Sequence, residues 1–101
     1  GDNPSKCVSG TIKNIDIHNN YFFNGHGDTI WILANTNTKI YDNLIHYSKA
    51  LTSVIMDIST SSDVNVYNNV LYNLTTSNMQ MIVSTSCTNL TNENNEERSS
   101  L

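Results

Sequence analysis

Few residues in this chain could perform acid–base chemistry, because only nine Asp or Glu and five Lys or Arg occur in 101 residues. Asp57 interrupts an apolar segment with alternating character, Met56 to Ser61, and is the candidate catalytic residue. Glycoside hydrolysis needs two carboxylates about 5–10 Å apart. Asp28 and Asp63, in neighbouring turns, are candidates for the second carboxylate, but no spacing selects either. The alternative for Asp57 is a solvated or salt-bridged surface residue.

A second set of candidate residues is aromatic. His18, Tyr41, Tyr67 and Thr91 occupy the same position in successive copies of a repeated phrase, and we expect them to form one outward column. The column beside it is polar: Asp16, Lys39, Asn65 and Asn89. Aromatic rings next to amides and carboxylates are typical of sugar-binding surfaces. The sequence thus predicts substrate binding by His18, Tyr41 and Tyr67, with stacking that only stabilises the sheet as the alternative.

The repeated phrase determines which elements position these residues. Placing Ile17, Ile40, Val66 and Leu90 in one column gives steps of 23, 26 and 24 residues. A period in the twenties indicates stacked supersecondary units. Each copy alternates β-branched and polar residues and then turns at an Asn pair, which predicts strands rather than helices.

Two further phrases recur between these copies. One begins at Trp31, Met56 and Met81 with steps of 25 residues, and the other is a short strand at residues 21–23, 44–46 and 70–72. This second phrase predicts that Trp31, Met56 and Met81 point inward, and that Ile30, Ile32, Ile55 and Ile82 point outward. These four isoleucines make the expected outer face unusually apolar, although Asp57 and Gln80 are also expected there, so we expect a partner to cover that face.

The Asn pairs predict a structural ladder. Asn20, Asn43 and Asn69 follow the strand of each copy, and we expect them to form the bends and to hydrogen-bond between coils. Glu93 is expected at the matching position of the fourth copy, so the ladder is expected to end there.

With these repeats, the chain resembles the right-handed parallel β-helix proteins of the pectate-lyase-like superfamily, which includes polysaccharide lyases, hydrolases and bacteriophage tailspikes. The resemblance covers residues 8–95 and implies an all-β solenoid of about four coils, each with three short strands, and an inward Asn ladder. It also implies a substrate cleft on the strand that carries Asp57. The calcium-binding acidic cluster of the family's lyases has no counterpart in the sequence. Because this fold hosts many chemistries, the resemblance predicts structure better than activity.

The domain organisation is expected to be simple: a lead-in at 1–7, one β-helix domain at 8–95 and a polar tail at 96–101. Four coils without end caps favour a piece of a longer β-helix or one protomer of an oligomer, such as a trimer. Cys7 and Cys87 lie coils apart, so no disulfide is expected between them. No segment reaches transmembrane length, no signal peptide is visible, and neither a metal site nor a cofactor motif is found.

The net charge of the chain argues against some classes of binding partner. A net charge of −4 argues against binding to nucleic acid or to anionic membranes. Two functions remain open. One is a carbohydrate-directed segment of a tailspike-like or appendage-like protein, extracellular or on a virion surface, that binds and also depolymerises polysaccharide if it is a hydrolase or lyase. The other is a purely structural or adhesive solenoid without catalysis.

Overall fold

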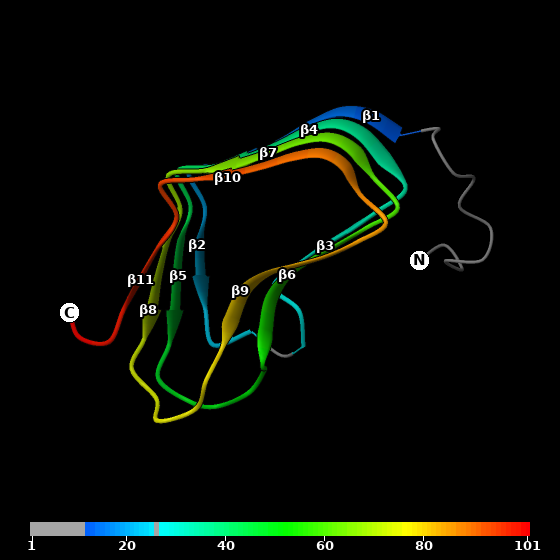
Figure 1. Ribbon diagram of the computed structural model, residues 1–101. Helices are drawn as coiled ribbons and strands as arrows, with labels where there is room; N and C mark the ends of the chain where they lie inside the picture. Colours follow the sequence, from blue (N-terminus) through cyan, green and yellow to red (C-terminus); the bar gives the residue numbers. More distant parts are fainter. Residues whose placement is uncertain (1–11, 26) are drawn as a thin grey trace.

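The computed structural model describes residues 12–25 and 27–101, with the side chain of Ile12 left out. The predictions for the lead-in and for Cys7 lie outside the described residues. Within the described part all regular secondary structure is β-strand. The fold is a parallel β-solenoid of about three turns followed by part of a fourth coil, which confirms the predicted fold class. Figure 1 looks nearly along its axis, so that successive coils lie behind one another.

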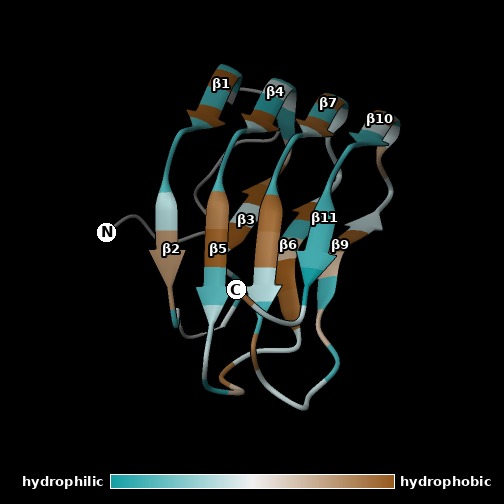
Figure 2. Cartoon of the chain, turned by 90° about the vertical axis from the view of Figure 1, so that its left-hand side faces the viewer, coloured by the Kyte–Doolittle hydropathy of each residue, from teal (hydrophilic) through white to brown (hydrophobic). Residues whose placement is uncertain are grey.

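In the described residues, eleven strands form three parallel sheets. Sheet A contains β1 (Ile12–His18), β4 (Asn35–Tyr41), β7 (Ser62–Tyr67) and β10 (Thr88–Glu93). Sheet B contains β2 (Tyr21–Phe23), β5 (Leu44–Tyr47), β8 (Val70–Asn73) and β11 (Glu96–Arg98). Sheet C contains β3 (Ile30–Leu33), β6 (Val54–Ser59) and β9 (Gln80–Thr85). Each strand pairs with its equivalent one coil away, as Figure 2 shows side by side. β11 belongs to the segment that was expected to be a polar tail.

The core is a set of inward columns, one residue per coil. On sheet A, Ile17, Ile40 and Val66 are in register, and the latter two are fully buried. On sheet B, Ile45 and Leu71 are in register and fully buried. Burial of such side chains contributes about 1.5–3 kcal/mol each, which makes these columns the main source of stability.

The predicted register of sheet C is wrong by one residue. Trp31 pairs with Asp57 rather than with Met56, and Ile32 pairs with Ile58. Ile32 is 4% exposed, whereas Trp31 is 59% exposed, so the inward and outward faces are exchanged in β3. A shift of one residue reverses the face of every side chain because strands have a period of two.

The expected outward apolar face therefore does not exist. Ile30, Ile32 and Ile55 belong to the buried core, and Ile82 packs against it. The reason given for a covering partner over these isoleucines is removed by their burial. The outward residues of β3 are instead Trp31 and Leu33.

The coil turns where residues adopt a left-handed backbone. At the bend between sheets A and B these residues are Asn19, Asp42, Asn68 and Asn94, with φ of 55, 55, 56 and 55°. The expected bend formers, Asn20, Asn43 and Asn69, each follow one of them. Asn and Asp tolerate this conformation better than other non-glycine residues. The bend is thus formed by the first residue of each pair, and the second is free to make hydrogen bonds.

The second residue of each pair forms the Asn ladder. Asn43 donates from its backbone N–H and from Nδ2 to Oδ1 of Asn69, at 3.1 and 2.9 Å. Its Nδ2 also donates to the carbonyl of Ile17 in the preceding coil. Asn43 and Asn69 are buried, so these bonds satisfy groups that water cannot reach.

The ladder continues one coil further than predicted. Asn95, not Glu93, accepts both donors of Asn69. Glu93 instead pairs in register with Tyr67, and Asn92 with Val66. The expected alignment of Leu90 with Val66 is wrong, because Leu90 pairs with Val64. The error arose because the fourth copy has lost the apolar residue that marked the column.

The inward columns become polar in the fourth coil. Asn92 continues the column of Val66, and Glu97 continues the column of Leu71. In the third coil, Ser84 already continues the column of Ile58 on sheet C. Figure 2 shows the same change on sheet B, where β5 and β8 are largely hydrophobic and β11 is hydrophilic. An inward charge such as that of Glu97 disfavours edge-to-edge pairing.

Candidate functional site

Asp57 lies on the outer face of β6, half-buried, between Trp31 and Val83 of the adjacent coils. Its Oδ1 accepts a hydrogen bond from Ser59 Oγ at 3.2 Å. Neighbouring strands of a sheet lie about 4.8 Å apart, so Trp31 and Asp57 are immediate neighbours. An exposed indole beside a carboxylate can hold a sugar through its ring face and its hydroxyl groups.

The two other carboxylates named with Asp57 lie on different parts of the coil. Asp28 is exposed in the connection between β2 and β3. Asp63 is exposed on β7, in sheet A, and its Oδ1 accepts from Asn89 Nδ2 at 2.7 Å. The three residues therefore come from sheet C, from sheet A and from a loop, and Asp57 has Ser59 rather than a second carboxylate as its hydrogen-bond partner.

The predicted aromatic column is present on sheet A. His18 stacks on Tyr41 with ring centroids 4.8 Å apart, and Tyr41 stacks on Tyr67 at 4.9 Å, with interplanar angles of 2° in both pairs. The fourth member is Glu93 rather than Thr91, which pairs with Asn65. We call His18, Tyr41 and Tyr67 the stacked column. Both faces of Tyr41 are covered by its neighbours, so this column presents ring edges outward.

One residue of the stacked column, Tyr41, has a shifted pKa. The pKa of the Tyr41 hydroxyl is raised, first by partial desolvation and then by the negative charges of Asp16 and Asp42 and the neighbouring Tyr67. Tyr41 therefore stays protonated and remains a hydrogen-bond donor throughout the neutral range. A row of such edges, one per coil, can bond hydroxyl groups but cannot stack on a sugar ring.

Sheet B carries a second aromatic group that the sequence reasoning missed. Phe23, His46 and Tyr72 are in register on its outer face, followed by Arg98 in the fourth coil. Tyr21 lies beside them, and its hydroxyl is 3.2 Å from His46 Nδ1. We call these five residues the sheet B face.

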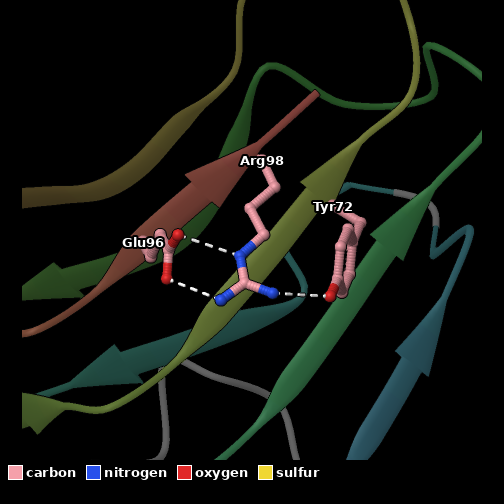
Figure 3. Close-up of polar contacts among 3 residues, drawn as sticks. All are labelled: Tyr72, Glu96 and Arg98. Atoms are coloured by element: carbon pink, nitrogen blue, oxygen red, sulfur yellow. Dashed lines mark hydrogen bonds and ion pairs between the residues drawn. The ribbon is translucent and has the colours of Figure 1, made fainter. Parts of the chain in front are cut away.

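Arg98 is the last residue of the sheet B face and lies in the fourth coil. Its Nε and Nη2 donate to the two carboxylate oxygens of Glu96, both at 2.9 Å, and its Nη1 donates to the Tyr72 hydroxyl at 2.9 Å (Figure 3). The guanidinium carbon lies 5.6 Å from the centroid of the Tyr72 ring. The pKa of the Glu96 carboxyl is lowered, chiefly by its hydrogen bonds to Arg98.

The signal for this face was available in the sequence. Phe23, His46 and Tyr72 all stand at the third position of the short-strand repeat. The short-strand repeat therefore places His46 between Phe23 and Tyr72. Arg98 was hidden because β11 falls where a polar tail was expected.

Other potential sites are limited in the described residues. Cys87 is a free thiol whose Sγ lies 3.2 Å from the carbonyl oxygen of Ile58. Between residues 12 and 101, without 26, no group of three or more His, Cys, Asp or Glu is arranged to hold a metal ion. The same part of the chain has no helix long and apolar enough to cross a membrane. Comparisons with protein families, with curated proteins and with solved structures gave no match.

Proposed function

We propose that this chain is a carbohydrate-directed β-solenoid segment that binds a surface polysaccharide. The observation that supports this best is the exposure of Trp31 directly beside Asp57 on sheet C. Covering this ring with a ligand would contribute favourably to binding, because apolar surface is then removed from water. A pyranose offers both an apolar face for the indole and hydroxyl groups for the carboxylate.

The stacked column supplies a second element of the proposal. His18, Tyr41 and Tyr67 repeat once per coil and direct polar edges outward. A polymer that crosses several coils would meet one such edge in each coil. Many weak contacts on one long ligand raise affinity without any single strong contact. We therefore expect weak binding of short sugars and firmer binding of polymers.

Depolymerisation is the less supported part of the proposal. Asp57 has a hydroxyl partner, Ser59, and hydrolysis through paired carboxylates requires a second acid at a suitable distance. A binding role for Asp57 needs no such partner. On this basis binding without cleavage is the function that the geometry favours, with Asp57 as hydrogen-bond acceptor.

The wider setting follows from the resemblance. We propose a pectate-lyase-like β-helix of the tailspike or appendage type, located outside the cell or on a virion surface. In that setting the segment would be part of a homotrimer or of a longer β-helical chain. Nucleic acid does not belong to the proposal, because the net charge is −4. Membrane insertion does not belong to it either, because no segment of the given sequence reaches transmembrane length.

A structural or adhesive solenoid without a glycan ligand is the second candidate. The observation in its favour is the 2° angle between the stacked rings, which satisfies the aromatic faces within the sheet itself. Such a column stabilises neighbouring coils and needs no ligand.

The experiment that tests these functions is incubation with a panel of bacterial surface polysaccharides, measuring retention on the polymer and the release of reducing ends. We expect retention without reducing ends, weakened by Trp31→Ala and by Asp57→Ala but preserved by Trp31→Phe. Leu33→Ala, on the same outer face, is the matched control and should retain binding. Release of reducing ends that Asp57→Asn abolishes would make the chain an enzyme. Neither signal would leave the structural solenoid.

A further inference from the structure

The sheet B face differs from the stacked column in how its rings lie. Phe23 and His46 make an edge contact at 65°, and His46 and Tyr72 are tilted by 52°. Tyr21 meets Phe23 at 63°. An edge contact leaves part of the ring surface uncovered, and Phe23 and Tyr21 are 56% and 59% exposed. On sheet B, therefore, Phe23 and Tyr21 leave ring surface open to a ligand, whereas His46 and Tyr72 are half-buried.

The ring faces on sheet B recur at the spacing of the coils. Phe23, His46 and Tyr72 occupy one column, so each coil contributes one ring along the solenoid axis. Adjacent strands are about 4.8 Å apart, which is comparable to the length of one sugar ring in an extended chain. A polysaccharide lying along the axis would therefore meet successive rings with successive sugar units.

The charges on this face cancel. Glu96 binds the guanidinium of Arg98 through both of its carboxylate oxygens, and Tyr72 takes a further donor of the same group. Figure 3 shows the fork of Arg98 occupied on both sides by these partners. An acidic polymer would have to displace Glu96 to reach Arg98. A neutral ligand needs no such displacement and can use the hydroxyls of Tyr21 and Tyr72 as hydrogen-bond partners.

From these observations we propose that the sheet B face is a second carbohydrate-binding surface, for a neutral hexopyranose chain that lies along the solenoid axis. The inference rests on the proposed function in that both concern glycans, but it assigns a different sheet and different residues. Phe23 and Tyr21 supply exposed ring surface, and Tyr72 supplies its hydroxyl and the uncovered part of its ring. His46 contacts the edge of Phe23, and Arg98 holds Tyr72 by a hydrogen bond. The face is distinct from the Trp31–Asp57 pair, which belongs to sheet C.

The test is affinity electrophoresis of the whole chain in gels containing neutral polymers (hydroxyethyl cellulose, mannan or dextran) or acidic polygalacturonate. We expect at least one neutral polymer to retard the protein. Phe23→Leu should lower the affinity about two- to tenfold, the range of a single aromatic contact. Phe23→Trp, which keeps a ring, should restore binding. Phe23→Leu keeps an apolar side chain at an exposed site, and its unfolding temperature checks that the fold is intact.

A Trp31→Ala variant separates this inference from the proposed function. If Trp31→Ala still binds the neutral polymer and Trp31→Ala/Phe23→Leu does not, the sheet B face is a site in its own right. If Trp31→Ala alone abolishes retardation, the proposed function stands and the sheet B assignment is overturned. If no neutral polymer retards the protein, the assignment is overturned, and binding of polygalacturonate alone would still support the proposed function. If Phe23→Leu changes the solution mass but not retardation, the face joins copies of the chain and the assignment is likewise overturned.

Discussion

Asn69 donates two hydrogen bonds to a single atom, Oδ1 of Asn95, one from its backbone N–H at 3.0 Å and one from its Nδ2 at 2.8 Å. Asn43 makes the same pair of bonds to Asn69. Each coil is therefore joined to the next at the bend between sheets A and B by side chains as well as by strand pairing. The bend is held from inside the solenoid, where water does not compete.

Substitution of Asn43 by Ala should destabilise the protein by about 1–3 kcal/mol, because the donors of Asn20 and the carbonyl of Ile17 lose their partner at this partly buried bend and Asn69 Oδ1 keeps only one of its two donors. Chemical unfolding of both proteins measures this difference. Asn78→Ala is the matched control, since Asn78 is exposed in a loop. Asn37 is unsuitable as a control because its φ is 58° and its Nδ2 bonds Asn14. Equal losses for Asn43 and Asn78 would contradict the role of the ladder.

The register of β3 predicts opposite outcomes for two adjacent positions. Ile32→Ala removes a buried side chain and should cost about 2–5 kcal/mol. Leu33→Ala truncates a residue that is 41% exposed, and its cost should stay within about 0.5 kcal/mol. Denaturant unfolding of the two variants decides between this register and the alternative, in which Leu33 is the buried residue.

The Glu96–Arg98 pair predicts a dependence on pH. Arg98 lowers the pKa of Glu96 from its usual 4.5, so folding favours the ionised carboxylate. This contribution to stability is present above the unfolded pKa and is lost as the pH falls through the lower, folded pKa. Carbon-13 NMR of the Glu96 carboxyl should show a midpoint below 4.5 that rises in Arg98→Gln. An identical midpoint in both proteins would show that the pair does not form in solution.

The polar inward residues of the fourth coil predict an effect on association. Glu97 follows Leu71 in an inward column and accepts a hydrogen bond from Asn73 Nδ2 at 3.2 Å. Glu97→Leu should create an apolar end and cause self-association, because an uncharged open edge favours pairing with another chain. Sedimentation over a range of concentrations measures this, with Glu97→Gln as the polar control. Equal masses for the two variants would argue against a protective role for the charge.

The fold was predictable where repeated residues mark the same column. Sheet A could be predicted from Ile17, Ile40 and Val66, and the ladder from Asn20, Asn43 and Asn69. Each of these positions has the same kind of residue in three coils. On sheet C the apolar residues fall on both faces of β3. There Trp31 and Ile32 both suit a core, and hydropathy alone could not place them.

The candidate site was predictable only in part, for a geometric reason. The sequence placed His18, Tyr41 and Tyr67 in one column, and the structure stacks them. Column membership does not fix ring tilt, which decides whether ring faces are open to a ligand. The 2° angles on sheet A and the angles of 52–65° on sheet B depend on side-chain packing, and so the more open surface was not recognised.

The coils differ in length at one corner only. The first coil is 23 residues long and the next ones 26. The step from sheet A to sheet B is constant (Ile17 to Phe22, Ile40 to Ile45), so the added residues lie in the connection from sheet B to sheet C. A peptide grafted into the exposed segment 76–78 should leave both flanking sheets in phase, whereas one deletion beside Asp42 would turn the following strand inside out. Each coil thus combines one corner that tolerates insertions with corners at which the number of residues is constant.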